Sequence, residues 1–288
     1  MIDPLFLAEA AINGLLLGGV LALLALGLNL IFGVIDIVWI AYVDLVMICM
    51  YAVYFIVQVY GYPMWLGGLA SVALGALLGI AVHLLIITPI LSSAPVNQLL
   101  ATGGLLFFLQ SFATFLWTTD HRSVRLTLPR LEIMDMPISV ARLIAFGLAV
   151  LAMLGLYLFL TRTYIGTAIR AVSQDREAMS LMGANPQRVY LVTSAVGGAM
   201  AGLAAALLII QYAVHPFFGA AFGPITFMIC VLGGLGNMVG AFVASFIMSE
   251  VISIGGVMWS TEMGYVIAFV FFIVMIFARP GGILGRRT

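Results

Sequence analysis

Residues 189–248 read VYLVTSAVGGAMAGLAAALLIIQYAVHPFFGAAFGPITFMICVLGGLGNMVGAFVASFIM and contain no Asp, Glu, Lys or Arg. Because about 20 apolar residues in a helix cross the hydrocarbon core of a bilayer, this run holds more than one span. Residues 10–34 and 45–117 are equally free of these charged residues. The whole chain is 8% charged, whereas soluble domains carry about 25% charged residues. The sequence therefore predicts an all-α protein that crosses a membrane several times.

We expect one transmembrane domain over residues 1–288, a polytopic bundle of about 8 to 10 spans. Breaks at Gly61-Tyr62-Pro63 and Ser92-Ser93-Ala94-Pro95 separate the early spans. The predicted spans are 5–32, 35–59, 65–88, 97–117, 139–160, 189–213, 223–236, 238–258 and 263–279. The span at 223–236 is short and ends in glycines, which is typical of a broken or re-entrant element.

Two polar loops, 118–138 and 161–188, are separated by one predicted span and therefore lie on opposite sides of the membrane. The first holds Arg122, Arg125 and Arg130, and the second holds Arg162, Arg170, Arg176 and Arg188. The C-terminal segment falls on the side of the second loop and adds Arg279, Arg286 and Arg287. Because cytoplasmic loops are enriched in basic residues, we assign loop 161–188 to the cytoplasm and loop 118–138 to the periplasm. With nine crossings the N-terminus faces outward.

Loop 161–188 has the pattern of an amphipathic helix or a pair of helices. One face carries Ile165, Ile169, Val172, Met179 and Met182, and another carries Arg170, Ser173, Gln174 and Glu177. Gly183, Asn185 and Pro186 form a stop signal after it. The helix either rests against the bundle and the lipid headgroups or docks a soluble partner.

Four segments together resemble the LivH-type permease subunits of bacterial branched-chain amino acid ABC importers. They are GTAIRAVSQDREAMSLMGANPQRV at 166–189, the first span at 14–33, VLGGLGNMVGA at 231–241 and RPGGILGR at 279–286. Within the first segment, Glu177, Ala178 and Gly183 match the EAA-x-x-x-G signature of ABC importer permeases. The Ile-x-Leu-Pro part of that signature is absent.

The resemblance implies a permease subunit that carries a branched-chain amino acid or a related small solute across the bacterial inner membrane by alternating access. It implies as partners a second homologous permease, two ATP-binding cassette subunits and a periplasmic solute-binding protein, within a lipid bilayer. ATP and Mg would be bound by the ATPase subunits, and the coupling residues would be Arg170, Asp175, Glu177, Ala178 and Gly183. The alternative is a gradient-driven transporter or channel that works without ATPase subunits.

Catalytic and cofactor motifs are missing from the sequence. A nucleotide-binding P-loop needs a lysine, and the chain has none. His83, His121 and His215 lie in different segments, which argues against a metal site. We therefore expect no enzymatic activity, no cofactor bound by this chain and no nucleic-acid partner. Cys49 and Cys230 lie in apolar runs and are expected to be buried thiols.

Acidic residues inside spans are energetically costly and are therefore candidates for function. Asp44 and Glu250 are the deepest by this assignment, and Asn29 and Gln110 either line a polar path or bond to backbone carbonyls.

The stretch VWIAYVDLVMICMY at 38–51 departs from the resembled family, which has small and polar residues where Trp39 and Tyr42 stand here. We expect Trp39, Tyr42, Asp44 and Glu250 to line the translocation path, with a changed cavity shape. Arg122, Arg125 and Arg130 either dock the binding protein or are simply solvated.

Overall fold

The computed structural model describes residues 4–124, 130–133, 136–183, 185–279 and 281–284. Almost all of them are helical, and one short antiparallel hairpin pairs Arg130 with Ser139. The elements are α1 (Pro4–Ile35), α2 (Tyr42–Tyr54), η1 (Phe55–Val59), α3 (Met64–Val82), η2 (His83–Ile87), α4 (Thr88–Ile90), α5 (Pro95–Trp117), β1 (Arg130–Ile133), β2 (Met136–Ser139), α6 (Val140–Arg162), α7 (Tyr164–Gln174), α8 (Arg176–Leu181), α9 (Pro186–Leu208), α10 (Phe218–Gly233), α11 (Met238–Met258) and α12 (Thr261–Ala278).

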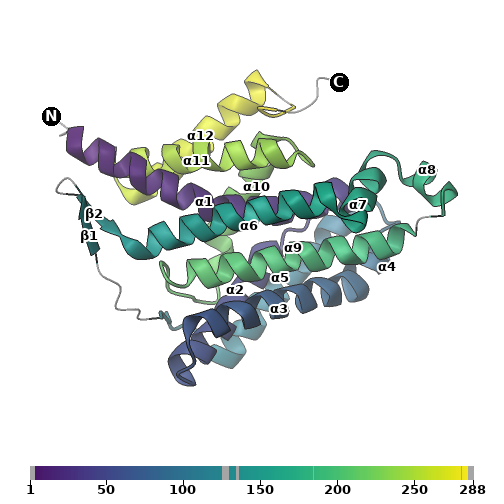
Figure 1. Ribbon diagram of the computed structural model, residues 1–288, viewed down its shortest axis with the longest axis horizontal. Coiled ribbons are helices and arrows are strands. Elements are labelled where there is room, and N and C mark those ends of the chain that lie inside the picture. The colour runs from purple at the N-terminus through teal and green to yellow at the C-terminus, as the bar shows by residue number, and fades with distance from the viewer. Residues whose placement is uncertain (1–3, 125–129, 134–135, 184, 280, 285–288) are drawn as a thin grey trace.

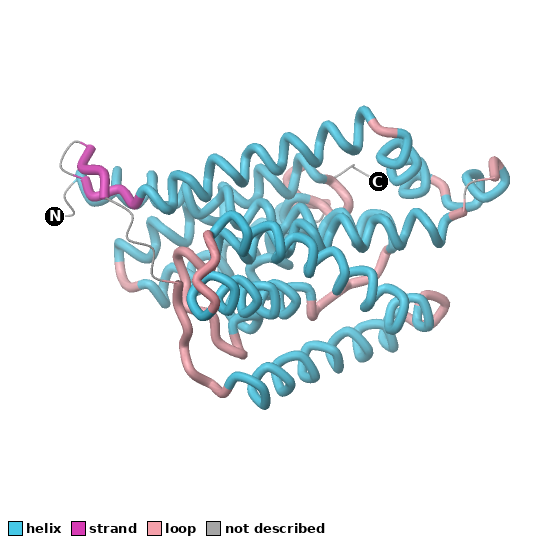
Figure 2. Tube along the Cα trace, turned by 60° about the horizontal axis from the view of Figure 1, so that its bottom comes forward, coloured by secondary structure: helices cyan, strands magenta, loops and turns pink. Residues whose placement is uncertain are grey.

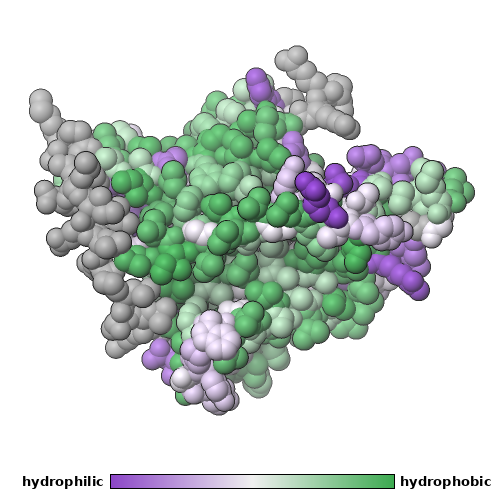
Figure 3. Space-filling model, viewed as in Figure 1, coloured by the Kyte–Doolittle hydropathy of each residue, from purple (hydrophilic) through white to green (hydrophobic). Residues whose placement is uncertain are grey.

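Eight helical segments of the described chain are long and apolar enough to cross a membrane, and α10 is a shorter apolar helix. The prediction of an all-α, multi-pass bundle is therefore confirmed. The helices run roughly side by side, and the hairpin and most loops lie at the ends of the bundle (Figure 2). The face in Figure 3 is hydrophobic across its middle and hydrophilic where α7 and α8 lie, as expected for a protein with a lipid belt.

The two predicted polar loops lie at opposite ends of the molecule (Figure 1). The N-terminus and the β1–β2 hairpin are at one end, and α7, α8 and the C-terminus are toward the other. Since the structure contains no membrane, the cytoplasmic and periplasmic assignment of these two ends stays a prediction.

Glycines allow the central helices to approach at backbone distance. The space that a side chain on Gly75 of α3 would need is occupied by the backbone of Gly198 and Gly202 on α9. The Ser71 hydroxyl donates to the carbonyl oxygen of Gly202 at 2.6 Å across the same seam. The sequence spaces these glycines as Gly-x-x-x-Gly pairs, Gly75/Gly79 and Gly198/Gly202, and both pairs pack at the seam, as small residues often do between membrane helices.

The start of α2 differs from the sequence prediction. Residues 36–41 were predicted to be helical, but they form a non-helical segment and α2 begins only at Tyr42. Asp36 has a φ of 65° in the left-handed region and ends the helical path of α1. Hydropathy could not reveal this break because Ile37, Trp39 and Ala41 are apolar and fully buried, as they would be in a helix.

The boundaries of α9 and α10 also differ from the prediction. α9 ends at Leu208, and α10 begins at Phe218, five residues before the predicted start, and contains Pro224. The predicted start at residue 223 lies next to this proline, a residue that usually breaks helices. Prolines are tolerated in membrane helices where neighbouring elements compensate.

Cys49 and Cys230 are buried and unpaired, which confirms their expected role as apolar groups. The Cys230 thiol donates to the carbonyl oxygen of Ala25 at 3.3 Å.

Candidate functional site

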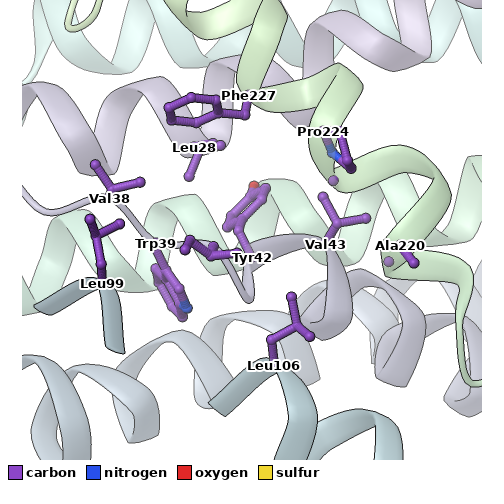
Figure 4. A pocket seen from close by; sticks show the side chains of 13 residues that line it. Leu28, Val38, Trp39, Tyr42, Val43, Leu99, Leu106, Ala220, Pro224 and Phe227 are labelled. Carbon is purple, nitrogen blue, oxygen red and sulfur yellow. The ribbon is translucent and has the colours of Figure 1, made fainter. Parts of the chain in front are cut away.

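A cavity of about 360 Å³ lies between the start of α2, with the break before it, and α10 (Figure 4). Its wall comes from four parts of the chain: α1, residues 38–43, α5 and residues 219–227 of α10. Leu28, Val43, Leu106 and Phe227 make it largely apolar. A space of this size and lining suits a small solute with an apolar body.

Tyr42 fixes the depth at which α2 begins. Its hydroxyl donates to the carbonyl oxygen of Gly197, midway along α9, at 2.9 Å. It also contacts Gly27, whose missing side chain leaves room for it. Residues 36–41 therefore lead from the end of α1 back into the bundle, and α2 starts inside it. Backbone without helical hydrogen bonds is tolerated at such depth only beside protein or water.

Trp39, one of the residues predicted to line a translocation path, also lines the cavity. Its ring meets the Tyr42 ring edge-on, with centroids 6.0 Å apart. The indole is buried, and its Nε1 has no hydrogen-bond partner among the described residues. A buried donor without a partner is costly, so its presence needs an explanation, of which a functional role is one.

Asp44 lies just beyond the cavity wall and is almost completely buried. The Gln110 side-chain amide donates to its Oδ1 at 3.1 Å, while Oδ2 has no partner among the described residues. The carboxylate lies against Gly219, where an added Cβ would be 2.8 Å from Oδ2. Gly219 is in the first turn of α10 and Asp44 in the first turn of α2. Both helix N-termini therefore favour a negative charge at this place.

The predicted path residues are not all in one place. Trp39 and Tyr42 line the cavity, and Asp44 borders it through Val43 and Gly219. Glu250 lies on α11 against Gly14 of α1 and is not among the lining residues. Gln110 pairs with Asp44, whereas Asn29 bonds to the backbone of Gly234, Gly236 and Asn237.

Sequence analysis missed the contribution of α10 to this site. Gly219, Ala220, Gly223, Pro224 and Phe227 line the cavity, but the predicted span began only at residue 223. The signal that could have revealed it is the run FFGAAFGP at 217–224, in which small residues and a proline interrupt an apolar helix.

Loop 161–188 forms two short helices joined at Asp175. Asp175 ends α7 and caps α8, with its Oδ1 accepting from the backbone N–H of Ala178 at 2.9 Å. Gly183 has a φ of 84°, which explains the glycine after α8, and Asn185 caps α9. This outcome agrees with the predicted helix pair and stop signal. Ala184 lies outside the described residues.

The two faces of this pair are only partly as predicted. Ile169 and Val172 are buried against the bundle, and Arg170 and Glu177 are exposed. Met182, however, is 85% exposed, and Leu181 is 89% exposed beside it. These apolar groups extend away from the bundle, so they are available to a partner protein.

At the opposite end, Arg122 is engaged within the chain. It donates to the carbonyl oxygen of Trp117 at 2.9 Å and lies 5.7 Å from the ring centroids of Tyr54 and Phe55. Its backbone also pairs with Val214. Arg125 lies outside the described residues, and Arg130 is described only as the first residue of β1.

The structure brings together two of the histidines that appeared scattered in the sequence. The rings of His121 and His215, from the loop after α5 and the loop before α10, lie 4.6 Å apart. Burial lowers the pKa of His215 below its usual value, and the nearby His121 lowers this pKa further. Within the described residues, no group of three metal-ligating side chains forms here or elsewhere.

Comparison with known proteins places these features in context. The family model described as "Branched-chain amino acid transport system / permease component" matches residues 10–277. The LivH high-affinity branched-chain amino acid transport system permease proteins of Salmonella typhimurium and Escherichia coli K12 are 29% identical, over 98% of this chain and 96% of theirs. The corresponding BraD protein of Pseudomonas aeruginosa is 27% identical over 96% of this chain and 95% of its own. No solved structure matches the chain.

Proposed function

We propose that this chain, which belongs to the family of branched-chain amino acid transport system permease components, is the translocation subunit of an ATP-driven importer. The solute would be a branched-chain amino acid or a related small organic molecule, carried across the bacterial inner membrane by alternating access. Membership of a permease family indicates transport rather than catalysis.

The cavity at the two helix breaks supports a solute path at this place. Its wall is apolar and includes a buried indole N–H, and a buried carboxylate lies just beyond the wall; both polar groups have unused hydrogen-bonding capacity among the described residues. Trp39, Tyr42 and Asp44 would form the path. Glu250 would belong to it only if the helices rearrange during transport, since it now faces α1.

A second homologous permease subunit would complete the passage. Ile40, Leu99 and Phe227 line the cavity and are also exposed at the surface of the single chain. Because residues 36–41 lack a helical ladder, protein is a better cover for this opening than lipid.

The α7–α8 pair is the observation that carries the ATP-driven form of the proposal. It is capped at both helices, ends in a sharp turn and presents the exposed apolar residues Leu181 and Met182. Two ATP-binding cassette subunits, which hold ATP and Mg, would dock here through Arg170, Asp175, Glu177, Ala178 and Gly183. A periplasmic binding protein would deliver the solute at the opposite end, where Arg122, Arg125 and Arg130 remain candidates for its docking.

Reconstitution of the chain with and without its ATPase partners tests this proposal. We expect ATPase subunits to copurify, and uptake into liposomes to require both ATP and the binding protein. Uptake by this chain alone down a solute or ion gradient would favour the alternative, a secondary transporter or channel.

The coupling residues can be tested in the same preparation. Gly183→Pro cannot adopt the positive φ seen here, and Glu177→Arg places a positive charge at the N-terminus of α8. We expect both variants to keep solute delivery from the binding protein but to lose most ATP-dependent uptake. Normal coupling in both would refute the docking assignment.

A further inference from the structure

Arg176 connects the cytoplasmic loop to the end of α1. Its Nη2 lies 4.0 Å from Asp36 Oδ2 and donates to the carbonyl oxygen of Val34 at 3.4 Å. Its guanidinium also lies 5.7 Å from the ring centroid of Tyr190 on α9. α8 has no buried residue, so Arg176 is one of its few attachments to the bundle, together with the partly buried Met179.

Asp36 is the first residue of the segment that leads to the cavity. Its positive φ marks the point at which the chain leaves α1, and Asp is one of the residues that tolerate this conformation. Trp39 and Ile40, which line the cavity, follow three and four residues later. The segment is also held at Val38, whose carbonyl oxygen accepts from the Thr102 hydroxyl at 3.1 Å.

The last turns of α1 are fixed by other contacts. The Asn29 amide donates to the carbonyl oxygen of Asn237 at 2.9 Å, and its Oδ1 accepts from the Gly236 N–H at 2.8 Å. Gly33 packs directly on Gly236. A force applied through Arg176 would therefore displace Asp36 and the residues after it more readily than α1 itself.

We propose that Arg176 is a positioning residue that links α8 to residues 36–41, so that displacement of the cytoplasmic loop moves Trp39 and Ile40 in the cavity wall. The displacement is attributed to an ATPase partner, and in this respect the inference rests on the proposed function. The ion pair is largely exposed and adds little to folding stability. A small difference in contact energy is nevertheless enough to shift the balance between two conformations.

The accessibility of residue 40 reports on this movement directly. We would introduce Ile40→Cys into a chain carrying Cys49→Ala and Cys230→Ala, and measure its rate of labelling by a water-soluble maleimide in the assembled complex. Trapping the complex with ATP and vanadate should change this rate. We expect Arg176→Gln to reduce that change about fivefold, the scale of an ordinary coupling between sites.

Arg188→Gln is the matched control for loss of an arginine. Arg188 is exposed on the same side of the molecule, and none of the interactions described above involves it. We expect it to leave the nucleotide-dependent labelling unchanged. An equal loss in both arginine variants would overturn the assignment, because it would indicate a general effect of charge.

Conservative variants distinguish the loss of the Arg176–Asp36 link from a general loss of folding. Asp36→Asn removes the charge but keeps a residue that tolerates the positive φ, and should reproduce the effect of Arg176→Gln. The double variant should be no worse than either single one, and Arg176→Lys should restore part of the response. Additive losses in the double variant would contradict the proposal.

The chain without partners provides a test that does not depend on the proposed function. Loss of the Arg176–Asp36 link should change the labelling rate of Ile40→Cys in the purified chain even without nucleotide. An unchanged rate in Arg176→Gln would refute the link. If the wild-type chain binds no ATPase subunit, the proposed function fails. Comparing the labelling rates with and without Arg176→Gln still decides whether Arg176 is linked to residues 36–41.

Discussion

Asp44 is held where the first turns of α2 and α10 meet inside the bundle. One of its oxygens is paired with Gln110, the other is free among the described residues, and both lie against Gly219. A glycine is required at position 219 because a Cβ there would overlap the carboxylate. The acid and this glycine therefore depend on each other, although they are 175 positions apart in the chain (219 − 44).

This requirement predicts a loss of stability in Gly219→Ala. The added methyl group must displace either the carboxylate or α10, and overpacking of this kind costs about 1–3 kcal/mol. We expect a lower thermal unfolding temperature in detergent for this variant. Gly223→Ala is the matched control, because an added Cβ at that position of the same helix meets no atom within 4 Å. Equal stability of the two variants would show that Asp44 is not held as described.

His215, in the loop before α10, predicts that the stability of the chain depends on pH. Its pKa is lowered in the folded chain, so the unfolded chain binds this proton first as the pH falls. The stabilisation is therefore present above the ordinary histidine pKa of about 6.5 and is lost as the pH falls below that value. Protonation would place a charge beside the His121 ring, where the backbone of Arg122 pairs with that of Val214.

We expect the unfolding temperature of the wild-type chain to fall between about pH 7.5 and 5.5, and to fall less in His215→Gln. His121→Gln should also reduce the dependence, since it removes the neighbour that lowers the pKa of His215 further. If the unfolding temperature changed with pH to the same extent in all three proteins, His121 and His215 would not be the source of the pH dependence.

The bundle depends on close packing between the backbones of neighbouring helices. Gly75 and Gly79 on α3 face Gly198 and Gly202 on α9, and the added Cβ of Gly75 would lie 2.9 Å from the backbone nitrogen of Gly202. Backbone atoms cannot rotate away as flexible side chains can. The sequence showed these glycine pairs, but it could not show which helices they join.

The α3–α9 seam predicts that Gly75→Ala lowers stability by about 1–3 kcal/mol, again through overpacking. Gly104→Ala on α5 is the control, since nothing within 4 Å would meet its Cβ and alanine favours helix. We expect thermal unfolding in detergent to distinguish the two variants. A destabilising effect confined to Gly104→Ala would contradict the packing described here.

Two elements changed most between the sequence prediction and the structure, α2 and α10. Both begin inside the bundle, and both predicted boundaries were wrong by several residues. Hydropathy follows burial, and the buried residues of the non-helical segment 36–41 are as apolar as those of a buried helix. The loop helices α7 and α8 were easier to predict because their amphipathic pattern and capping residues are local signals.

At the scale of the whole molecule, the nine apolar helices of the described chain place its two ends on opposite sides. We expect a reporter enzyme fused after the C-terminus to be active in the cytoplasm, and a cysteine at Phe6 to react with an impermeant reagent from the periplasm. Phe6 is exposed near the N-terminus. If the reporter enzyme and the cysteine at position 6 lay on the same side of the membrane, α10 would not complete a crossing.

The sequence alone determined the membrane class, the approximate helices, the amphipathic loop and the permease family. The first three follow from composition, short-range periodicity and capping residues, and the family follows from the resemblance of four segments to known permeases. None of these needs knowledge of distant contacts. Only the tertiary structure decided that Trp39 and Tyr42 share a cavity with α10, that Gln110 pairs with Asp44, and that Arg176 reaches Asp36. Each of these contacts joins residues far apart in the chain. Their partners depend on how the helices are packed, and hydropathy is nearly the same for many possible packings.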